Sequence, residues 1–85
     1  GNPAPVVQIA GAKIVEVSAM GKEGGHLSMR VGNKRLRCIW WGHGKCIDRL
    51  HAGTMIDFVG KIKVNEFRGN ITAEIDIIDI ALPSS

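Results

Sequence analysis

Apolar and polar residues alternate along most of the chain, and the longest regular stretch covers residues 55–80. Its apolar positions recur at every second residue in two halves: Ile56, Phe58, Gly60, Ile62 and Val64, and then Ile71, Ala73, Ile75 and Ile77. Alternation over this length is typical of half-buried strands. Residues 65–70, between the halves, include Arg-Gly-Asn, which tolerates the positive φ of a tight reversal. The stretch therefore predicts a two-stranded hairpin with its turn at residues 65–70.

Three further alternating segments precede this hairpin, at residues 6–20, 26–31 and 34–41. Gly11 predicts a bend or bulge in the first segment, residues 21–25 predict a turn, and Gly32-Asn33 predicts a two-residue hairpin turn. Alternation in the second and third segments directs these side chains inward: Leu27, Met29, Val31, Leu36, Cys38 and Trp40. It directs these outward: His26, Ser28, Arg30, Arg35, Arg37, Ile39 and Trp41. We therefore expect His26 to be solvated, Trp40 to lie in the core and Trp41 to lie at the surface.

Residues 42–51 depart from the two-residue period. Ile47 and Leu50 recur at helical spacing and Gly53 follows as a stop, so we expect a short helix. The predicted order is three strands, a short helix and two strands, which makes the fold all-β with one short helix. This is the order of a five-stranded Greek-key barrel of the OB-fold type (oligonucleotide/oligosaccharide-binding). An SH3-like barrel is the main alternative, and a helix between the third and fourth strands favours the OB-fold.

The size and composition of the chain are those of one small domain. We place this domain at residues 6–82, between a linker or cloning scar at 1–5 and a tail at 83–85. No apolar run reaches the roughly 18 residues of a membrane span, and no signal-peptide pattern is present. The two cysteines, Cys38 and Cys46, are too few for the disulfide framework of a small secreted domain. We therefore expect a cytoplasmic domain with two buried thiols and no membrane partner.

The basic residues of the second and third strands are the main functional signal. The net charge of +3 permits a polyanionic partner without requiring one. Arg30, Arg35 and Arg37 are expected on the outward side, where nucleic acid crosses OB barrels, and Trp41 is expected beside them. Single-strand binders combine such a charged groove with aromatic rings on which bases stack. The alternative is that these charges only solvate the barrel.

The hairpin adds further candidates. Lys61 and Lys63 are expected outward, opposite Glu74 and Asp76, and we favour cross-strand ion pairs over phosphate contacts because carboxylates repel phosphate. At the hairpin tip, Phe67 either contacts the ligand or folds back over the barrel mouth. The candidate nucleic-acid-binding residues are therefore Arg30, Arg35, Arg37, Trp41, Lys61, Lys63, Phe67 and Arg68.

No arrangement of residues in the sequence points to catalysis. Residues 21–25 lack the Lys-Ser or Lys-Thr of a phosphate-binding loop, and no nucleophile–base set or pair of inward carboxylates occurs. Cys38, His43, Cys46 and His51 offer zinc-type ligands, but their spacing is not that of a common zinc finger, and Cys38 should point into the barrel. We expect no catalytic residue, metal site or cofactor in this chain.

Several segments carry a family resemblance through their order and spacing: residues 25–30, Ile39-Trp40-Trp41-Gly42, a helix ending at Leu50, residues 51–57, Asn65-Glu66-Phe67-Arg68-Gly69 and Ile78-Asp79-Ile80. The turn at 65–69 followed by a strand ending in Asp-Ile is the most specific of these. Together, over residues 14–80, they resemble the OB domain of RecJ, the bacterial single-stranded-DNA-specific exonuclease family.

The resemblance implies a function by position in a larger protein. The catalytic part of such an enzyme is a two-domain phosphoesterase with Asp/His metal motifs, served by Mg²⁺ or Mn²⁺, and no Asp-His-His triplet occurs here. This chain would then grip single-stranded DNA for a 5′-to-3′ exonuclease of DNA repair and recombination, with the catalytic domains of the parent chain as its other partner. Two alternatives remain open: an OB module that docks a catalytic core or protein partner, and an RNA-binding OB domain of the translation apparatus.

Overall fold

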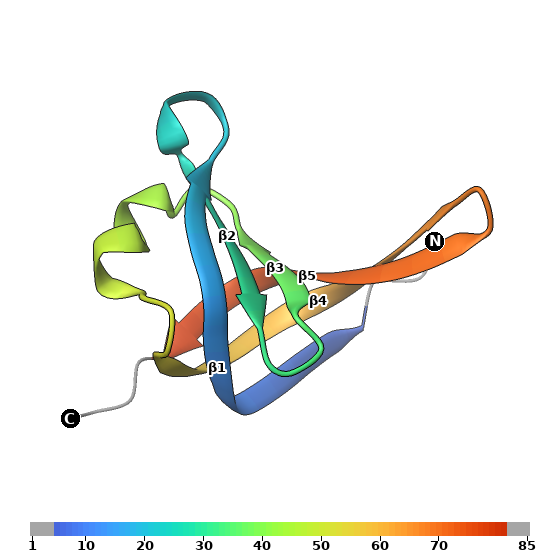
Figure 1. Cartoon of the computed structure of the whole chain (residues 1–85), viewed down its shortest axis with the longest axis horizontal. Helices are drawn as coiled ribbons and strands as arrows, with labels where there is room; N and C mark the ends of the chain where they lie inside the picture. Colours follow the sequence, from blue (N-terminus) through green and yellow to red (C-terminus); the bar gives the residue numbers. More distant parts are fainter. Residues whose placement is uncertain (1–4, 82–85) are drawn as a thin grey trace.

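The computed structural model describes residues 5–81, which form a closed barrel of five strands (Figure 1). The elements in chain order are β1 (Val6–Met20), the 3₁₀-helix η1 (Lys22–Gly24), β2 (His26–Val31), β3 (Leu36–Trp40), the 3₁₀-helix η2 (Gly44–Arg49), β4 (Met55–Phe67) and β5 (Asn70–Ala81). Neighbouring strands follow the order β1-β2-β3-β5-β4, and β4 closes back on β1. This is the topology predicted for an OB-fold, and it excludes the SH3-like alternative.

The barrel closes because β1 is long enough to serve two partners. Its first half pairs antiparallel with β4, and its second half pairs antiparallel with β2. The predicted irregularity at Gly11 is present: the register with β4 shifts between Ile9 and Ala12, and Gly11 has φ +67°. The Gly11 amide donates a hydrogen bond of 2.8 Å to Oδ1 of Asp57 on β4. This bulge bends β1 from one half of the barrel to the other.

Side chains from all five strands and η2 fill the barrel. The buried members of this core are Ala12, Ile14, Leu27, Met29, Val31, Cys38, Leu50, Ile56, Phe58, Ile75 and Ile77. Leu36 and Trp40 are partly buried against the same cluster, so the predicted inward set is confirmed. No helix in residues 5–81 is long and apolar enough to cross a membrane.

Helix η2 plugs one end of the barrel and contacts the β1–β2 connection. Gly44, its first residue, is buried, and its amide donates a 3.1 Å hydrogen bond to the Gly25 carbonyl. A Cβ atom at Gly44 would overlap the Gly24 carbonyl oxygen and lie 2.8 and 2.9 Å from the carbonyl carbons of Gly24 and Gly25. Only glycine allows the two backbones to approach this closely. The predicted short helix is therefore present, but it is a 3₁₀-helix.

The β2–β3 connection is longer than predicted. It spans the four residues from Gly32 to Arg35 instead of a two-residue turn at Gly32-Asn33. Gly32 and Arg35 both have positive φ, at +74° and +53°, and the Arg35 amide donates a 3.1 Å hydrogen bond to the Gly32 carbonyl. Alternation predicts Arg35 on the third strand. The structure instead places Arg35 in the β2–β3 loop.

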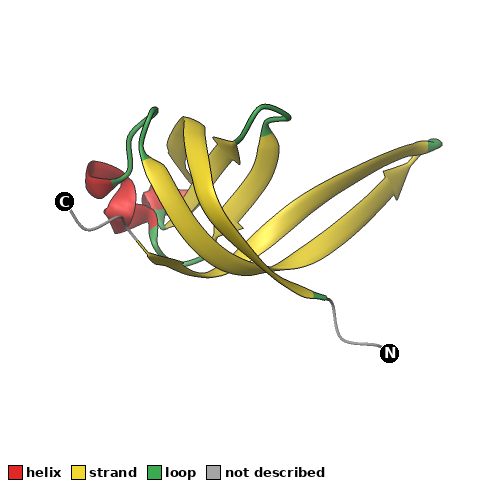
Figure 2. Ribbon diagram, turned by 90° about the horizontal axis from the view of Figure 1, so that it is seen from below, coloured by secondary structure: helices red, strands yellow, loops and turns green. Residues whose placement is uncertain are grey.

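The β4–β5 hairpin turns more tightly than predicted and projects beyond the barrel. Its strands pair as far as Phe67 and Asn70, which leaves a two-residue turn at Arg68-Gly69 with φ of +50° and +81°. Residues 64–73 of this hairpin are here called the arm, and Figures 1 and 2 show the end of the hairpin extending away from the other strands. Val64, Ile71 and Ala73 continue the inward face in sequence, yet all three are exposed because no other strand within residues 5–81 faces the arm.

The predicted domain boundaries lie partly among residues that the structure does not describe. Residues 1–4 and 82–85 are not among the described residues, so the leading segment, the tail and the boundary at 82 stay predictions. Pro5 is described, and its carbonyl accepts a 3.0 Å hydrogen bond from the Ile62 amide of β4. The last residue of β5, Ala81, pairs with Asp57.

The buried thiol of Cys38 should make the free energy of unfolding fall as the pH rises above 9. Burial raises the pKa of this thiol from 9.0 to about 12, an effect that Arg30 partly opposes, and Sγ lies 3.7 Å from the Leu36 carbonyl. Above pH 9 the unfolded chain releases a proton that the folded chain keeps, so ionisation favours unfolding as pH rises. We expect the wild type to lose about 1 kcal/mol more unfolding free energy than Cys38→Val between pH 9 and pH 10. Urea denaturation at both pH values measures this difference, and equal losses would contradict it.

Candidate nucleic-acid interface

The outward side chains of β2, β3, β5 and β4 form one continuous surface, here called the outer face. Strand register places Arg30 beside Arg37, Arg37 beside Glu74, and Glu74 beside Lys63. The next row along the strands contains Ser28, Ile39, Asp76 and Lys61. Trp41 follows the end of β3 on the same side. The register thus brings Arg30, Arg37, Trp41, Lys61 and Lys63 onto one surface, as alternation predicted.

Carboxylates compensate part of this positive charge. Arg37 lies 3.7 Å from Glu74, Lys63 lies 3.3 Å from Asp76, and Arg35, from the β2–β3 loop, lies 3.7 Å from Glu16 on β1. The predicted β4–β5 ion pairing is confirmed for Lys63 and Asp76, whereas Glu74 pairs with Arg37 of β3. Partly exposed pairs of this kind contribute about 0–1 kcal/mol each. They leave the cations accessible to a stronger anionic ligand.

Arg30 and Lys61 are the least compensated cations of the outer face. Both side chains are exposed, and within residues 5–81 neither has a carboxylate partner at ion-pair distance. Nη1 of Arg30 donates a hydrogen bond of 3.3 Å to the carbonyl oxygen of Arg35, which ties the guanidinium to the β2–β3 loop. A phosphate could bind Arg30 without first displacing a carboxylate.

The two tryptophans have the different environments that alternation predicted. Trp41 is 47% exposed, and its Nε1 donates a 3.0 Å hydrogen bond to Oδ1 of Asp76. Trp40 is partly buried against the core and stacks on His43, with ring centroids 4.1 Å apart and an interplanar angle of 5°. Trp41 is therefore the ring that the outer face can offer to a nucleobase.

Two outward positions differ from the expectation of simple exposure. Ile39 faces outward but is only 3% exposed, and the Trp41 indole reaches from the end of β3 to Asp76, the register partner of Ile39. His26 is half-buried and not solvated: its Nδ1 accepts a 2.8 Å hydrogen bond from the Gly42 amide, and its ring meets the Trp41 ring edge-on at 5.0 Å. An outward position in the alternation therefore does not by itself mean exposure to solvent.

Phe67 and Arg68 lie at the tip of the arm, separate from the other candidates. Phe67 is 70% exposed, so the alternative that it folds back over the barrel mouth is wrong. The Arg68 guanidinium lies 5.2 Å from the Phe67 ring centroid, a cation–π contact. Figures 1 and 2 both place this tip away from β2 and β3. A ligand would have to extend along the arm to touch both places.

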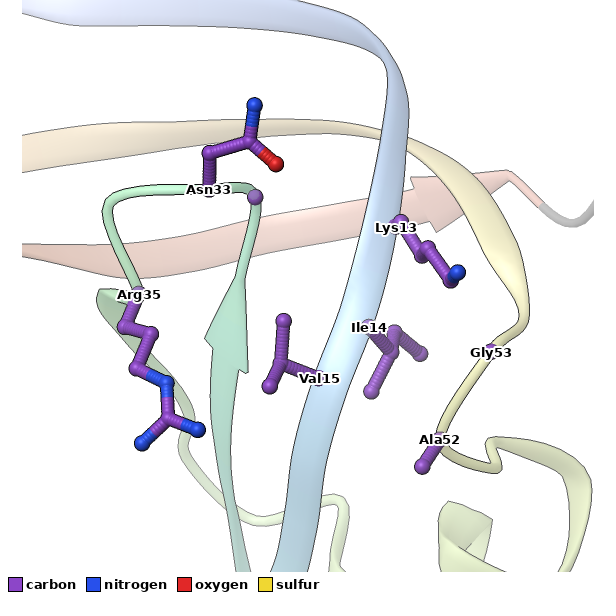
Figure 3. A pocket seen from close by; sticks show the side chains of 8 residues that line it. Lys13, Ile14, Val15, Asn33, Arg35, Ala52 and Gly53 are labelled. Atoms are coloured by element: carbon purple, nitrogen blue, oxygen red, sulfur yellow. The ribbon is translucent and has the colours of Figure 1, made fainter.

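An open hollow of about 570 Å³ lies beside β1, between the β2–β3 loop and the segment before β4 (Figure 3). It is lined by Lys13, Ile14, Val15, Gly32, Asn33, Arg35, Ala52 and Gly53. Figure 3 shows the side chains of Lys13, Asn33 and Arg35 pointing in different directions. Small-molecule sites need a few polar groups that converge on one point. The polar side chains that line this hollow therefore do not converge on one point.

No metal site is found in the described part of the chain. No group of three or more His, Cys, Asp or Glu side chains within residues 5–81 is placed to hold an ion. Of the four residues considered for zinc, Cys38 is fully buried, whereas His43 and His51 are exposed. Both cysteines are free thiols.

Sequence reasoning missed the shared role of Asp76. Alternation placed Asp76 on the outer face and identified it as a partner for a β4 lysine. Only the parallel pairing of β3 with β5 brings it within reach of Trp41. No local sequence signal specifies which strands pair in this way.

Three comparisons with known proteins agree. A family model described as the RecJ OB domain matches residues 1–79. The single-stranded-DNA-specific exonuclease RecJ of Bacillus subtilis is 26% identical over 83 residues, which cover 95% of this chain and 11% of that protein. Crystal structures of Thermus thermophilus RecJ with Mg²⁺ and with Mn²⁺ each match with a TM-score of 0.65 and 26% identity. They cover 100% and 99% of this chain, respectively, and 12% of the Thermus chain in both cases.

Proposed function

The chain belongs to the RecJ OB-domain family, and we propose that it binds single-stranded DNA through the outer face, without strong sequence preference. One observation carries the proposal: an exposed tryptophan lies on the same surface as Arg30, Arg37 and Lys63. Phosphates would contact the cations, and a base would stack on Trp41. Contacts of this type read the backbone and the π-face shared by all bases, so they carry little sequence information.

In this proposal the chain holds the strand and another part of a RecJ protein cuts it. The chain spans about one ninth of the Bacillus relative, whose name describes a single-stranded-DNA-specific exonuclease. The parent would be a 5′-to-3′ exonuclease of DNA repair and recombination that acts in the cytoplasm. The metal ions in the Thermus complexes suggest Mg²⁺ or Mn²⁺ as its cofactor, held by catalytic domains outside this chain.

Replacing Trp41 tests the proposal directly. We expect Trp41→Ala to weaken binding of a fluorescently labelled oligo(dT) about tenfold at low salt, because one base loses its stacking surface. Fluorescence anisotropy titration measures the change. Met55→Ala is the matched control, since Met55 is 45% exposed at the start of β4, where it pairs with Lys13 of β1 and not with β5. Equal affinities for wild type and Trp41→Ala would place the binding site elsewhere.

The arm favours a second candidate function from another class. Val64 and Ile71 share one face of the arm by strand register and are 66% and 70% exposed, so this face offers an apolar strip to a protein surface. The chain would then dock a catalytic domain or another protein partner. Binding of oligo(dT) that is weak at low salt and insensitive to added salt would favour this candidate over the first. Competition between oligo(dT) and oligo(U) separates DNA binding from the RNA-binding alternative.

A further inference from the structure

Asp76 contacts both an aromatic side chain and a cation of the outer face, the two kinds of side chain that would bind a single strand. Its Oδ1 accepts the 3.0 Å hydrogen bond from Nε1 of Trp41, and its Oδ2 lies 3.3 Å from Nζ of Lys63. The side chain is half-buried, and the backbone pairs with β3 at Ile39 and with β4 at Lys61. One carboxylate in a fixed position therefore holds both an aromatic ring and a cation.

The bond to Asp76 fixes the orientation of Trp41. The indole has a single hydrogen-bond donor, and this donor is committed to Asp76, while the ring also meets His26 edge-on. Trp41 is nevertheless close to half exposed. An aromatic ring that is already immobilised costs less entropy when a base stacks on it than a ring that must first be ordered.

The same carboxylate has the opposite effect on Lys63. Its charge offsets that of the ammonium group, and it would repel an approaching phosphate. A phosphate that binds Lys63 must first replace Asp76 as its partner. Asp76 therefore has two effects on a bound strand, and they act in opposite directions.

We propose that Asp76 is the positioning residue of a nucleotide subsite, in which Trp41 receives a base and Lys63 receives a phosphate of the same single strand. Oδ1 prepares the stacking surface, and Oδ2 restrains the cation until a phosphate displaces it. This inference rests on the proposed function and extends it, because it assigns a binding role to a residue that carries the same sign of charge as the ligand.

Two substitutions at this position separate the effects. Asp76→Asn keeps an oxygen that can accept the Trp41 hydrogen bond and removes the charge, so oligo(dT) should bind about threefold more tightly at low salt. Asp76→Ala removes both the charge and the acceptor, so it should bind more weakly than Asp76→Asn. Glu74→Gln is the matched control: it releases Arg37 in the same way but does not touch Trp41.

A double-mutant cycle assigns the difference to Trp41. In a Trp41→Ala background, Asp76→Asn and Asp76→Ala should bind oligo(dT) equally, because the acceptor no longer has a ring to hold. A second readout needs no DNA. With Trp40→Phe, Trp41 is the only tryptophan, and its fluorescence should lose protection from acrylamide quenching in Asp76→Ala but not in Asp76→Asn.

The outcomes separate failure of the subsite from failure of the proposed function. Equal affinity and equal quenching for Asp76→Asn and Asp76→Ala, in a chain that binds oligo(dT), would overturn the positioning role alone. Absence of oligo(dT) binding by the unaltered chain would overturn the proposed function and the subsite together. Rescue by Asp76→Asn of both affinity and protection from quenching supports the inference.

Discussion

Gly44→Ala is expected to lower the free energy of unfolding by about 3 kcal/mol, at the upper end of the usual cost of overpacking. The added methyl group would overlap the Gly24 carbonyl oxygen, and this obstacle is backbone, which cannot rotate away as a side chain can. Relief requires η2 to move off the β1–β2 connection. That movement would break the hydrogen bond from Gly44 to Gly25 and loosen the packing of Leu50.

Thermal and urea denaturation followed by circular dichroism measure this effect. A loss of this size corresponds to a melting temperature about 12–24 °C lower for a domain of this length. Gly25→Ala is the control, because Gly25 has φ −73° and a Cβ there would meet only the Lys22 carbonyl oxygen, at 3.8 Å. We expect this control to change stability little. A Gly44→Ala protein as stable as the control would show that η2 can shift without cost.

Reversing two charges on the outer face should weaken binding of oligo(dT) by about a hundredfold or more at low salt. The variant combines Arg30→Glu with Arg37→Glu, two residues that pair directly across β2 and β3. This variant replaces two phosphate contacts with two repulsive charges. It should also reduce the slope of log affinity against log salt concentration by about 1–2, because about 0.7 counterion is released per phosphate contact with a single strand.

The control for this variant is Lys45→Glu with Arg49→Glu. These exposed residues lie on η2, at one end of the barrel and not among the outward side chains of the strands, and their reversal changes the net charge by the same amount. A similar loss of affinity in both variants would indicate that only net charge matters, and the outer face would lose its special role. Because Glu at position 37 would face Glu74, the melting temperature of each variant should be measured alongside its affinity.

Alternation in the sequence predicts the strands and most of the core. Side chains at every second position of β2 and β3 fill the barrel as expected, and the bulge at Gly11 is where glycine indicated it. The turns are predicted less well, because Arg35 and Arg68 adopt positive φ although neither is glycine or asparagine. Positive φ at such residues is set by the strands that the loop must join, and local sequence does not report it.

Exposure and site geometry depend on pairings that are distant in sequence. Val64 and Ile71 continue an apolar pattern but lie beyond the reach of β1 and β3, so the pattern overstates their burial. Ile39 shows the reverse case, since it faces outward in the alternation but is buried. The ion pair between Lys63 and Asp76 was predictable from sequence, whereas the pairing of Arg37 with Glu74 became evident only from the strand order.

The parallel pairing of β3 with β5 links the site to the folding reaction. Each antiparallel hairpin, β2–β3 and β4–β5, can form from residues that are close in sequence. By contrast, residues 37–39 meet residues 74–76 only when distant parts of the chain come together. Non-local contacts of this kind form slowly, since the entropy of loop closure is lost before the contacts compensate for it. Arg37, Glu74 and Asp76 all lie in these two segments, so a chain with both hairpins formed but the barrel open would have no complete outer face. The capacity to bind a strand should therefore arise together with barrel closure, as the last step of folding rather than the first.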